Sequence, residues 1–294
     1  MRVIILGAFL SFFIFFFFLP AGMAQTSSKE KIVVTLYPLY ITVINIVDGH
    51  PNFEVTMMTG PNGGCLHDYS PSPADIKKVL GSTLIVANGA GLENFLDKIL
   101  KSYPNIPIVQ ASEGYKLIKE EGGGSNPHLW ASIDGAIFQA KKISEAILLN
   151  YPQYAELFKR NADRYIEKLV KLKKQMETDL APYRGEKIIT FHEAFPYFAL
   201  EFNLEIKGVI ELDPGREPSA KELMETTNLV KREKIKYLFV EPQYPRKIAE
   251  IISKESGAGL LTLDPAASGK LEQNAYIDIM KKNLSTLKDA FARP

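Results

Sequence analysis

This sequence has very little cysteine, histidine and tryptophan, and almost no net charge. Cys65 is its only cysteine, so no disulfide can form within the chain and a buried apolar core has to hold the fold together. Its 35 lysines and arginines nearly balance 34 aspartates and glutamates. This balance argues against a basic groove for nucleic acid and against an acidic tail. We therefore expect a monomeric globular protein without a nucleic-acid partner.

The longest apolar run lies at the N-terminus. Residues 3–19 are almost all apolar, and residues 20–24 (PAGMA) add a proline and small residues. This order is typical of a secretory signal peptide, residues 1–24, cleaved before Gln25. An uncleaved membrane anchor is the alternative, because a run of this length could just span a bilayer. The predicted cleavage site has no cysteine, so lipid attachment there is chemically excluded and we expect a soluble periplasmic protein.

Short β-branched runs alternate with helical stretches along the rest of the chain. The expected strands are residues 32–36, 53–58, 83–87, 106–109, 187–191, 204–210, 236–240 and 259–263. Such alternation predicts parallel sheets covered by helices. Ser72, with Asp75 in the third helical position, is expected to cap one of these helices. Because the strands fall into two sets, we expect an α/β fold with two lobes, residues 25–152 and 183–294.

A single long helix is predicted between the two sets of strands. Residues 153–181 contain no glycine or proline, and apolar residues recur at steps of three and four from Tyr154 to Leu180. At 1.5 Å per residue this helix would be about 40 Å long. We expect residues 153–182 to be a rigid helix that packs along both lobes. A long surface helix of one domain is the alternative.

Three of the four histidines follow predicted strands. His67, His128 and His192 lie in such loops, and Asp264 directly follows the last strand. Open α/β sheets place ligands at the carboxyl ends of their strands, so these side chains would converge between the lobes. Three imidazoles and a carboxylate suit tetrahedral Zn²⁺. Their spacing matches no local zinc motif, however, so each could also be a structural residue. His50, in a turn-like segment, is expected to be a solvated loop residue.

The chain also resembles the metal-binding solute-binding proteins of zinc and manganese ABC importers. The resemblance rests on HDYSPSPADI, NGAGLENFLDKIL, NPHLW, FHEAFPYFALEFNLEIKG, VEPQYPRK and LDPAASG, which occur in order from Lys31 to the final helix. It implies two α/β lobes joined by one long helix, with the metal between them. The positions that match the family's ligands are His67, His128, His192 and Asp264. It further implies that the protein hands the ion to a membrane permease powered by an ATPase.

Two departures from this family bear on the metal. The segment ahead of the second ligand, KEEGGGSNPH, lacks the added histidines that zinc importers often carry there. His192, in contrast, stands where manganese-selective relatives tend to have glutamate, and imidazole shifts the preference toward zinc. We expect Zn²⁺ as the transported ligand, with Mn²⁺ as the alternative. Asn126 replaces an aspartate that is common in the family, which removes a charge near the ligands.

Several neighbouring residues have two interpretations. Cys65 could add a thiolate ligand, but we expect a free thiol because four ligands are already assigned. Glu193 could orient a ligand or cap the following helix, and we expect the cap. Asp68 is expected to support its loop. Glu241 is either a hydrogen-bond acceptor for a ligand histidine or a carboxylate at a helix start. Trp130 is expected to pack in the core.

A zinc-dependent hydrolase is a competing function. Glu193 or Glu241 could serve as its general base. Catalytic zinc usually keeps an open water position, whereas Asp264 would close the coordination sphere. We therefore expect a binding protein and not an enzyme. A surface adhesin on the same scaffold is a third class, but nothing in the sequence marks an adhesive face.

Overall fold

A computed structural model describes residues 29–60, 69–120, 123–210 and 218–292. The predicted signal peptide lies outside these ranges, as do His67, Cys65 and Asp68. No helix within the described ranges is long and apolar enough to cross a membrane.

The first half of the chain forms a parallel four-stranded sheet in the order β2-β1-β3-β4. Its elements are β1 (Glu30–Val34), α1 (Tyr37–Ile46), β2 (Phe53–Met57), α2 (Pro73–Leu80), β3 (Leu84–Ala87), α3 (Leu96–Ser102) and β4 (Ile108–Gln110). Side chains of β1 and β3 alternate between two apolar clusters on opposite faces of the sheet. Burial on both faces explains why these strands read as continuous apolar runs.

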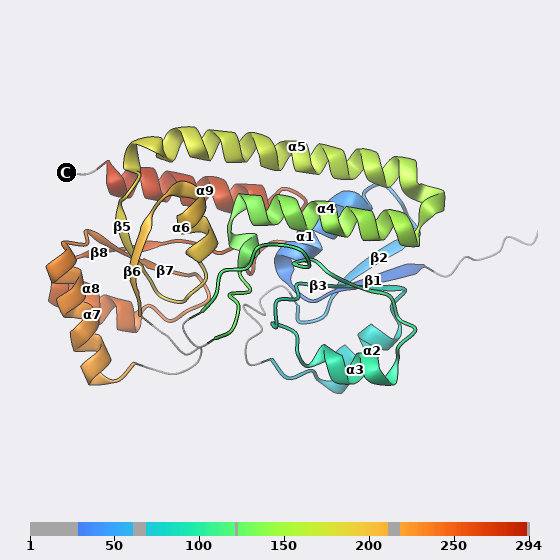
Figure 1. The fold of residues 1–294 in the computed structure, drawn as a ribbon, viewed down its shortest axis with the longest axis horizontal. Helices are drawn as coiled ribbons and strands as arrows, with labels where there is room; N and C mark the ends of the chain where they lie inside the picture. The colour runs from blue at the N-terminus through green and yellow to red at the C-terminus, as the bar shows by residue number, and fades with distance from the viewer. Residues whose placement is uncertain (1–28, 61–68, 121–122, 211–217, 293–294) are drawn as a thin grey trace, which may run out of the picture.

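The second half repeats this arrangement, with a parallel sheet in the order β6-β5-β7-β8. Its elements are β5 (Lys187–Thr190), α6 (Pro196–Phe202), β6 (Glu205–Val209), α7 (Ala220–Glu233), β7 (Tyr237–Val240), α8 (Lys247–Ser256), β8 (Gly259–Thr262) and α9 (Ala275–Phe291). Figure 1 shows helices on both sides of each sheet. The predicted fold class, two parallel sheets flanked by helices, is confirmed.

The long helix α5 (Ala155–Leu180) runs along the whole molecule, beside α4 (Ile133–Asn150) and α9 (Figure 1). Short 3₁₀ turns, Pro152–Tyr154 and Ala181–Tyr183, extend it at both ends. Its apolar stripe is buried from Phe158 to Leu180. The helix contacts α1 of the first half and α9 of the second, so it is not a surface helix of one lobe. One apolar cluster includes residues of both halves, so the core is shared between them. The predicted lobe boundaries stay a prediction.

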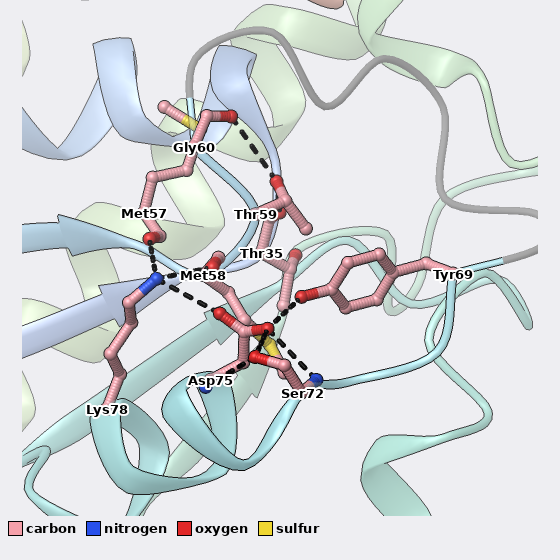
Figure 2. Close-up of polar contacts among 9 residues, drawn as sticks. All are labelled: Thr35, Met57, Met58, Thr59, Gly60, Tyr69, Ser72, Asp75 and Lys78. Carbon is pink, nitrogen blue, oxygen red and sulfur yellow. Dashed lines mark hydrogen bonds and ion pairs between the residues drawn. The ribbon is translucent and has the colours of Figure 1, made fainter.

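A polar network fixes the start of α2 (Figure 2). Ser72 Oγ accepts a hydrogen bond from the Asp75 amide at 3.3 Å, and Asp75 Oδ2 accepts from the Ser72 amide at 3.0 Å. The predicted cap is therefore confirmed. Asp75 also accepts from the Tyr69 hydroxyl at 2.6 Å and from Lys78 Nζ at 3.0 Å. Lys78 in turn donates to the Met58 carbonyl at 2.8 Å, which ties the end of β2 to α2.

Candidate metal centre

The described candidate ligands lie in loops at the ends of strands or before a helix. His192 follows β5 and Asp264 follows β8, both at the carboxyl ends of their strands. His128 directly precedes the 3₁₀ turn Leu129–Ala131, which leads into α4. His67 lies outside the described residues. These are the positions at which parallel α/β sheets present side chains to ligands.

The rings of His128 and His192 meet where the two halves of the chain come together. Their centroids are 4.8 Å apart and the ring planes are nearly perpendicular, at 85°. Both residues are almost completely buried, with 1% and 2% of their surfaces exposed. Two imidazoles this close, one from each half of the chain, could bind the same ion.

Glu241 lies against His192 at the end of β7. Glu241 Oε1 accepts a hydrogen bond from the His192 amide at 3.2 Å, and Oε2 is 3.6 Å from His192 Nδ1. Gln243 Nε2 donates to Oε2 at 2.7 Å, so the buried carboxylate is held in place. Helix α8 begins only at Lys247, which excludes Glu241 as a carboxylate at its start. The position beside His192 fits the acceptor role that the sequence suggested.

Asp264 is held by α9 and by its own turn. Its amide donates to Asn283 Oδ1 at 2.9 Å, and its Oδ1 accepts from the Ala266 amide at 2.8 Å. Burial raises the pKa of Asp264 to about 6; the Ala266 amide opposes this rise and the negative charge of Glu241 adds to it. A cation between these two carboxylates and the histidines would relieve their repulsion and favour the ionised form of Asp264.

Trp130 connects the loop of His128 with the loop of Asp264. Its indole Nε1 donates to the Pro265 carbonyl at 3.0 Å, and its ring centroid is 5.2 Å from that of His128. The side chain is fully buried, which confirms the predicted packing in the core. The indole therefore forms part of the surroundings of His128.

The structure brings only part of the predicted set together. Within the ranges that the structure describes, no group of three or more His, Cys, Asp and Glu side chains is arranged to hold a metal ion. His128 and His192 form a close pair. Trp130 bonds to Pro265, next to Asp264, and the charge of Glu241 acts on the Asp264 carboxyl. His67, the remaining predicted ligand, stays a prediction.

Two further predictions concern Glu193 and His50. Helix α6 begins at Pro196, with Phe195 at its N-cap position and no side-chain cap hydrogen bond from that residue, and the capping role of Glu193 stays a prediction. His50 lies in a loop and is partly exposed, as expected, and its ring centroid also lies 4.1 Å from that of Tyr154 and 5.2 Å from that of Phe53. Phe53 is near His50 along the chain, but only the tertiary fold brings Tyr154 to it.

The role of Asn126 was missed by sequence reasoning. Its side chain contacts both His128 and the backbone of Glu193, next to His192. The sequence offered one signal, the departure from the aspartate that is common at this position. The pattern could not show that two loops distant in sequence meet at this amide.

Comparisons with known proteins identify the family of the chain. A family model described as zinc-uptake complex component A, periplasmic (ZnuA), matches residues 32–290. The chain is 30% identical to the zinc-binding lipoprotein AdcA of Streptococcus pneumoniae over 91% of this chain and 57% of AdcA. It is also 30% identical to the high-affinity zinc uptake system protein ZnuA of Bacillus subtilis, over 89% of this chain and 88% of that protein. The chain spans 57% to 61% of the length of the AdcA proteins it matches.

Solved structures share the fold and hold different metals. The solute-binding protein FpvC of Pseudomonas aeruginosa in complex with Mn²⁺ superimposes with a TM-score of 0.80 at 30% identity, over 90% of this chain and 98% of FpvC. Zn(II)-bound AdcA of Streptococcus pneumoniae superimposes with a TM-score of 0.79 at 30% identity, over 90% of this chain and 58% of AdcA. The matched family is one of extracytoplasmic binding proteins, not enzymes, which leaves the hydrolase alternative without support.

Proposed function

The chain belongs to the zinc-uptake complex component A family, and from this premise we propose that it captures Zn²⁺ outside the cytoplasm and delivers it to an ABC importer. The observation that carries this proposal is the buried pair of His128 and His192, contributed by the two halves of the chain. The partners would be the membrane permease of the importer and its ATPase.

The proposed ligands are His67, His128, His192 and Asp264. The close histidine pair and the buried Asp264 carboxylate support three of them, and the family resemblance supports His67. Each ligand must be deprotonated to bind, and imidazole is largely neutral near pH 7. Four inner-sphere bonds would offset the loss of the hydration shell of the ion.

Zinc is proposed over manganese because of the donor atoms. Similar structures hold either Zn²⁺ or Mn²⁺, so the choice rests on the ligands of this chain. Three imidazoles favour zinc, whereas manganese prefers additional oxygen donors. Manganese remains the alternative cargo.

Binding would be signalled by small shifts of the ligand loops. Helix α5 contacts helices of both halves, and one apolar cluster extends through both. Opening the halves widely would expose part of this cluster to water at a large cost in free energy. We therefore propose that the ion draws the ligand loops together and that the permease recognises the resulting surface.

The compartment and the N-terminal processing of the protein are also proposals. We propose a signal peptide of residues 1–24 and a periplasmic protein that carries no lipid, because its cleavage site has no cysteine. AdcA of Streptococcus pneumoniae is named a lipoprotein, and this description applies to that relative only.

The decisive experiment is a competitive titration of metal-stripped mature protein with Zn²⁺ and Mn²⁺. Fluorescence of Trp130, the only tryptophan, reports on the surroundings of His128, and elemental analysis gives the stoichiometry. One tightly bound zinc that manganese displaces poorly is the expected result. A preference for manganese would reverse the metal assignment, and no stoichiometric binding of either ion would refute the proposed site.

A further inference from the structure

The side-chain amide of Asn126 joins the loops of two proposed ligands. Asn126 Oδ1 accepts a hydrogen bond from the His128 amide at 3.0 Å and lies 3.1 Å from His128 Nδ1. At its other end, Nδ2 donates to the Glu193 carbonyl at 2.9 Å, one residue beyond His192. Asn126 is completely buried, so water does not compete for these bonds.

The two backbone partners determine which end of the amide is oxygen. A backbone N–H can only donate, and a backbone carbonyl can only accept. Oδ1 must therefore face His128, and Nδ2 must face Glu193. An amide oxygen cannot donate, so the contact at 3.1 Å requires the proton of the neutral imidazole to be on His128 Nδ1. The lone pair is then on Nε2.

We propose that Asn126 is a positioning residue that holds His128 as the Nδ1-protonated tautomer, with Nε2 as the nitrogen that binds the metal. This inference rests on the proposed function. Hydrogen bonds to the second nitrogen of a ligand histidine commonly set its tautomer and ring orientation in this way. Asn126 additionally couples the orientation of His128 to the loop that carries His192.

The coupling requires an amide and not a carboxylate. An aspartate at position 126 could accept from His128, but it could not donate to the Glu193 carbonyl and would place two acceptors face to face. The backbone of Asn126 is held independently of its side chain. Its carbonyl accepts from the Tyr197 hydroxyl at 2.7 Å, and its amide donates to the Ile118 carbonyl at 2.8 Å. Variants of the side chain should therefore leave the loop in place.

Two variants of Asn126 distinguish its hydrogen bond with His128 from its hydrogen bond with the Glu193 carbonyl. Asn126→Ala removes both the acceptor for His128 and the donor for Glu193, whereas Asn126→Asp removes only the donor. Metal-free mature protein labelled with ¹⁵N-histidine is examined by long-range ¹H–¹⁵N correlation, and the His128 signals are assigned from their loss in His128→Gln. Zinc affinity is then measured by competition with a chelator.

We expect the Nδ1-protonated tautomer of His128 in the parent protein and in Asn126→Asp, and a mixture of tautomers in Asn126→Ala. Zinc binding should weaken by about 10-fold to 100-fold in Asn126→Ala, as for other partners of ligand histidines, and by less in Asn126→Asp. Asn161→Ala is the matched control. This buried amide on α5 donates to the Ile46 and Asp48 carbonyls, so its loss should lower thermal stability without changing the tautomer or the affinity.

The parent protein tests the tautomer before any substitution is made. An Nε2-protonated His128 in the metal-free parent, or a tautomer unchanged in Asn126→Ala, would overturn the inference. So would an altered tautomer with unaltered zinc affinity. If the parent bound no metal at all, the proposed function would fail, and the inference about metal binding would fail with it; the tautomer measurement would then show separately whether Asn126 orients His128.

Discussion

The imidazole rings of His128 and His192 meet edge to face with their centroids 4.8 Å apart, although they come from different halves of the chain. Each ring has its own polar neighbour: Asn126 lies against His128, and Glu241 lies against His192. An ion bound by both rings would therefore connect two loops whose orientation is already determined by buried side chains.

Loss of one ligand should weaken zinc binding strongly. Structural zinc sites contribute about 10–16 kcal/mol over four ligands, so we expect His192→Ala to bind zinc roughly 100-fold to 1,000-fold more weakly. Competition with a chelator measures this change. His50→Gln is the matched control, because His50 packs against Tyr154 away from the histidine pair. Equal affinity of His192→Ala and the parent protein would show that His192 is not a ligand.

The donor atom at position 192 should influence metal selectivity. His192→Glu replaces an imidazole nitrogen by a hard carboxylate oxygen, and we expect the ratio of manganese affinity to zinc affinity to rise about 10-fold or more. Parallel titrations with both ions measure this ratio. An unchanged ratio would mean that another feature of the site selects the metal.

The carboxylate of Glu241 should strengthen metal binding through His192. In Glu241→Gln the side-chain oxygen can still accept from the His192 amide, so the fold should be kept while the negative charge near Nδ1 is lost. We expect zinc affinity to fall about 10-fold to 100-fold. Glu250→Gln, on the exposed side of α8, is the control. If both variants bind zinc equally well, Glu241 has no role in binding.

Asp75 should stabilise the fold in a way that depends on pH. Burial raises the pKa of Asp75, but hydrogen bonds from Ser72, Tyr69 and Lys78 outweigh burial and hold the pKa well below its usual value of 3.8. The lowered pKa means that this stabilisation is complete above about pH 4 and is lost as the pH falls through the folded-state pKa. At pH 7 we expect Asp75→Asn to lower the free energy of unfolding by about 1–3 kcal/mol.

Urea denaturation at pH 7 and pH 3 tests this prediction. The difference between Asp75→Asn and the parent protein should be smaller at pH 3. Asp163→Asn removes an exposed ion pair with Lys159 and should have little effect at either pH, because exposed pairs contribute little. A difference for Asp75→Asn that does not change with pH would contradict the assigned ionisation.

Glu201 should have the opposite pH dependence. Its carboxylate oxygens accept from the amides of Ile133 and Asp134, at 2.7 and 3.1 Å, at the start of α4. Burial raises the pKa of Glu201 to about 7, and the charge of Asp134 adds to the rise. Between about pH 4.5 and pH 7 the folded state then binds a proton that the unfolded state lacks, so stability falls as the pH rises through this window.

Glu201→Gln removes this titration. The decrease in the free energy of unfolding between pH 5 and pH 7 should be smaller in the variant than in the parent protein. Denaturation series across this range provide the comparison. Parallel curves for the two proteins would show that Glu201 has the same pKa in the folded and unfolded states.

Much of the fold could be predicted from the sequence because its signals are local. The β-branched runs, the uninterrupted stripe from Phe158 to Leu180 and the cap formed by Ser72 and Asp75 depend on residues close together in the chain. The contact between His50 and Tyr154 could not be predicted, because it depends on the packing of segments that are distant in sequence.

The sequence by itself determined the two sets of parallel strands, the long helix and the residue types that suit zinc, since hydrophobic periodicity and donor chemistry are properties of the chain. Only the tertiary structure decided that His128 meets His192, that Glu241 lies beside His192, and that Asn126 bridges their two loops. These contacts join residues distant in sequence, and they form because burial of a shared apolar core brings the two halves together.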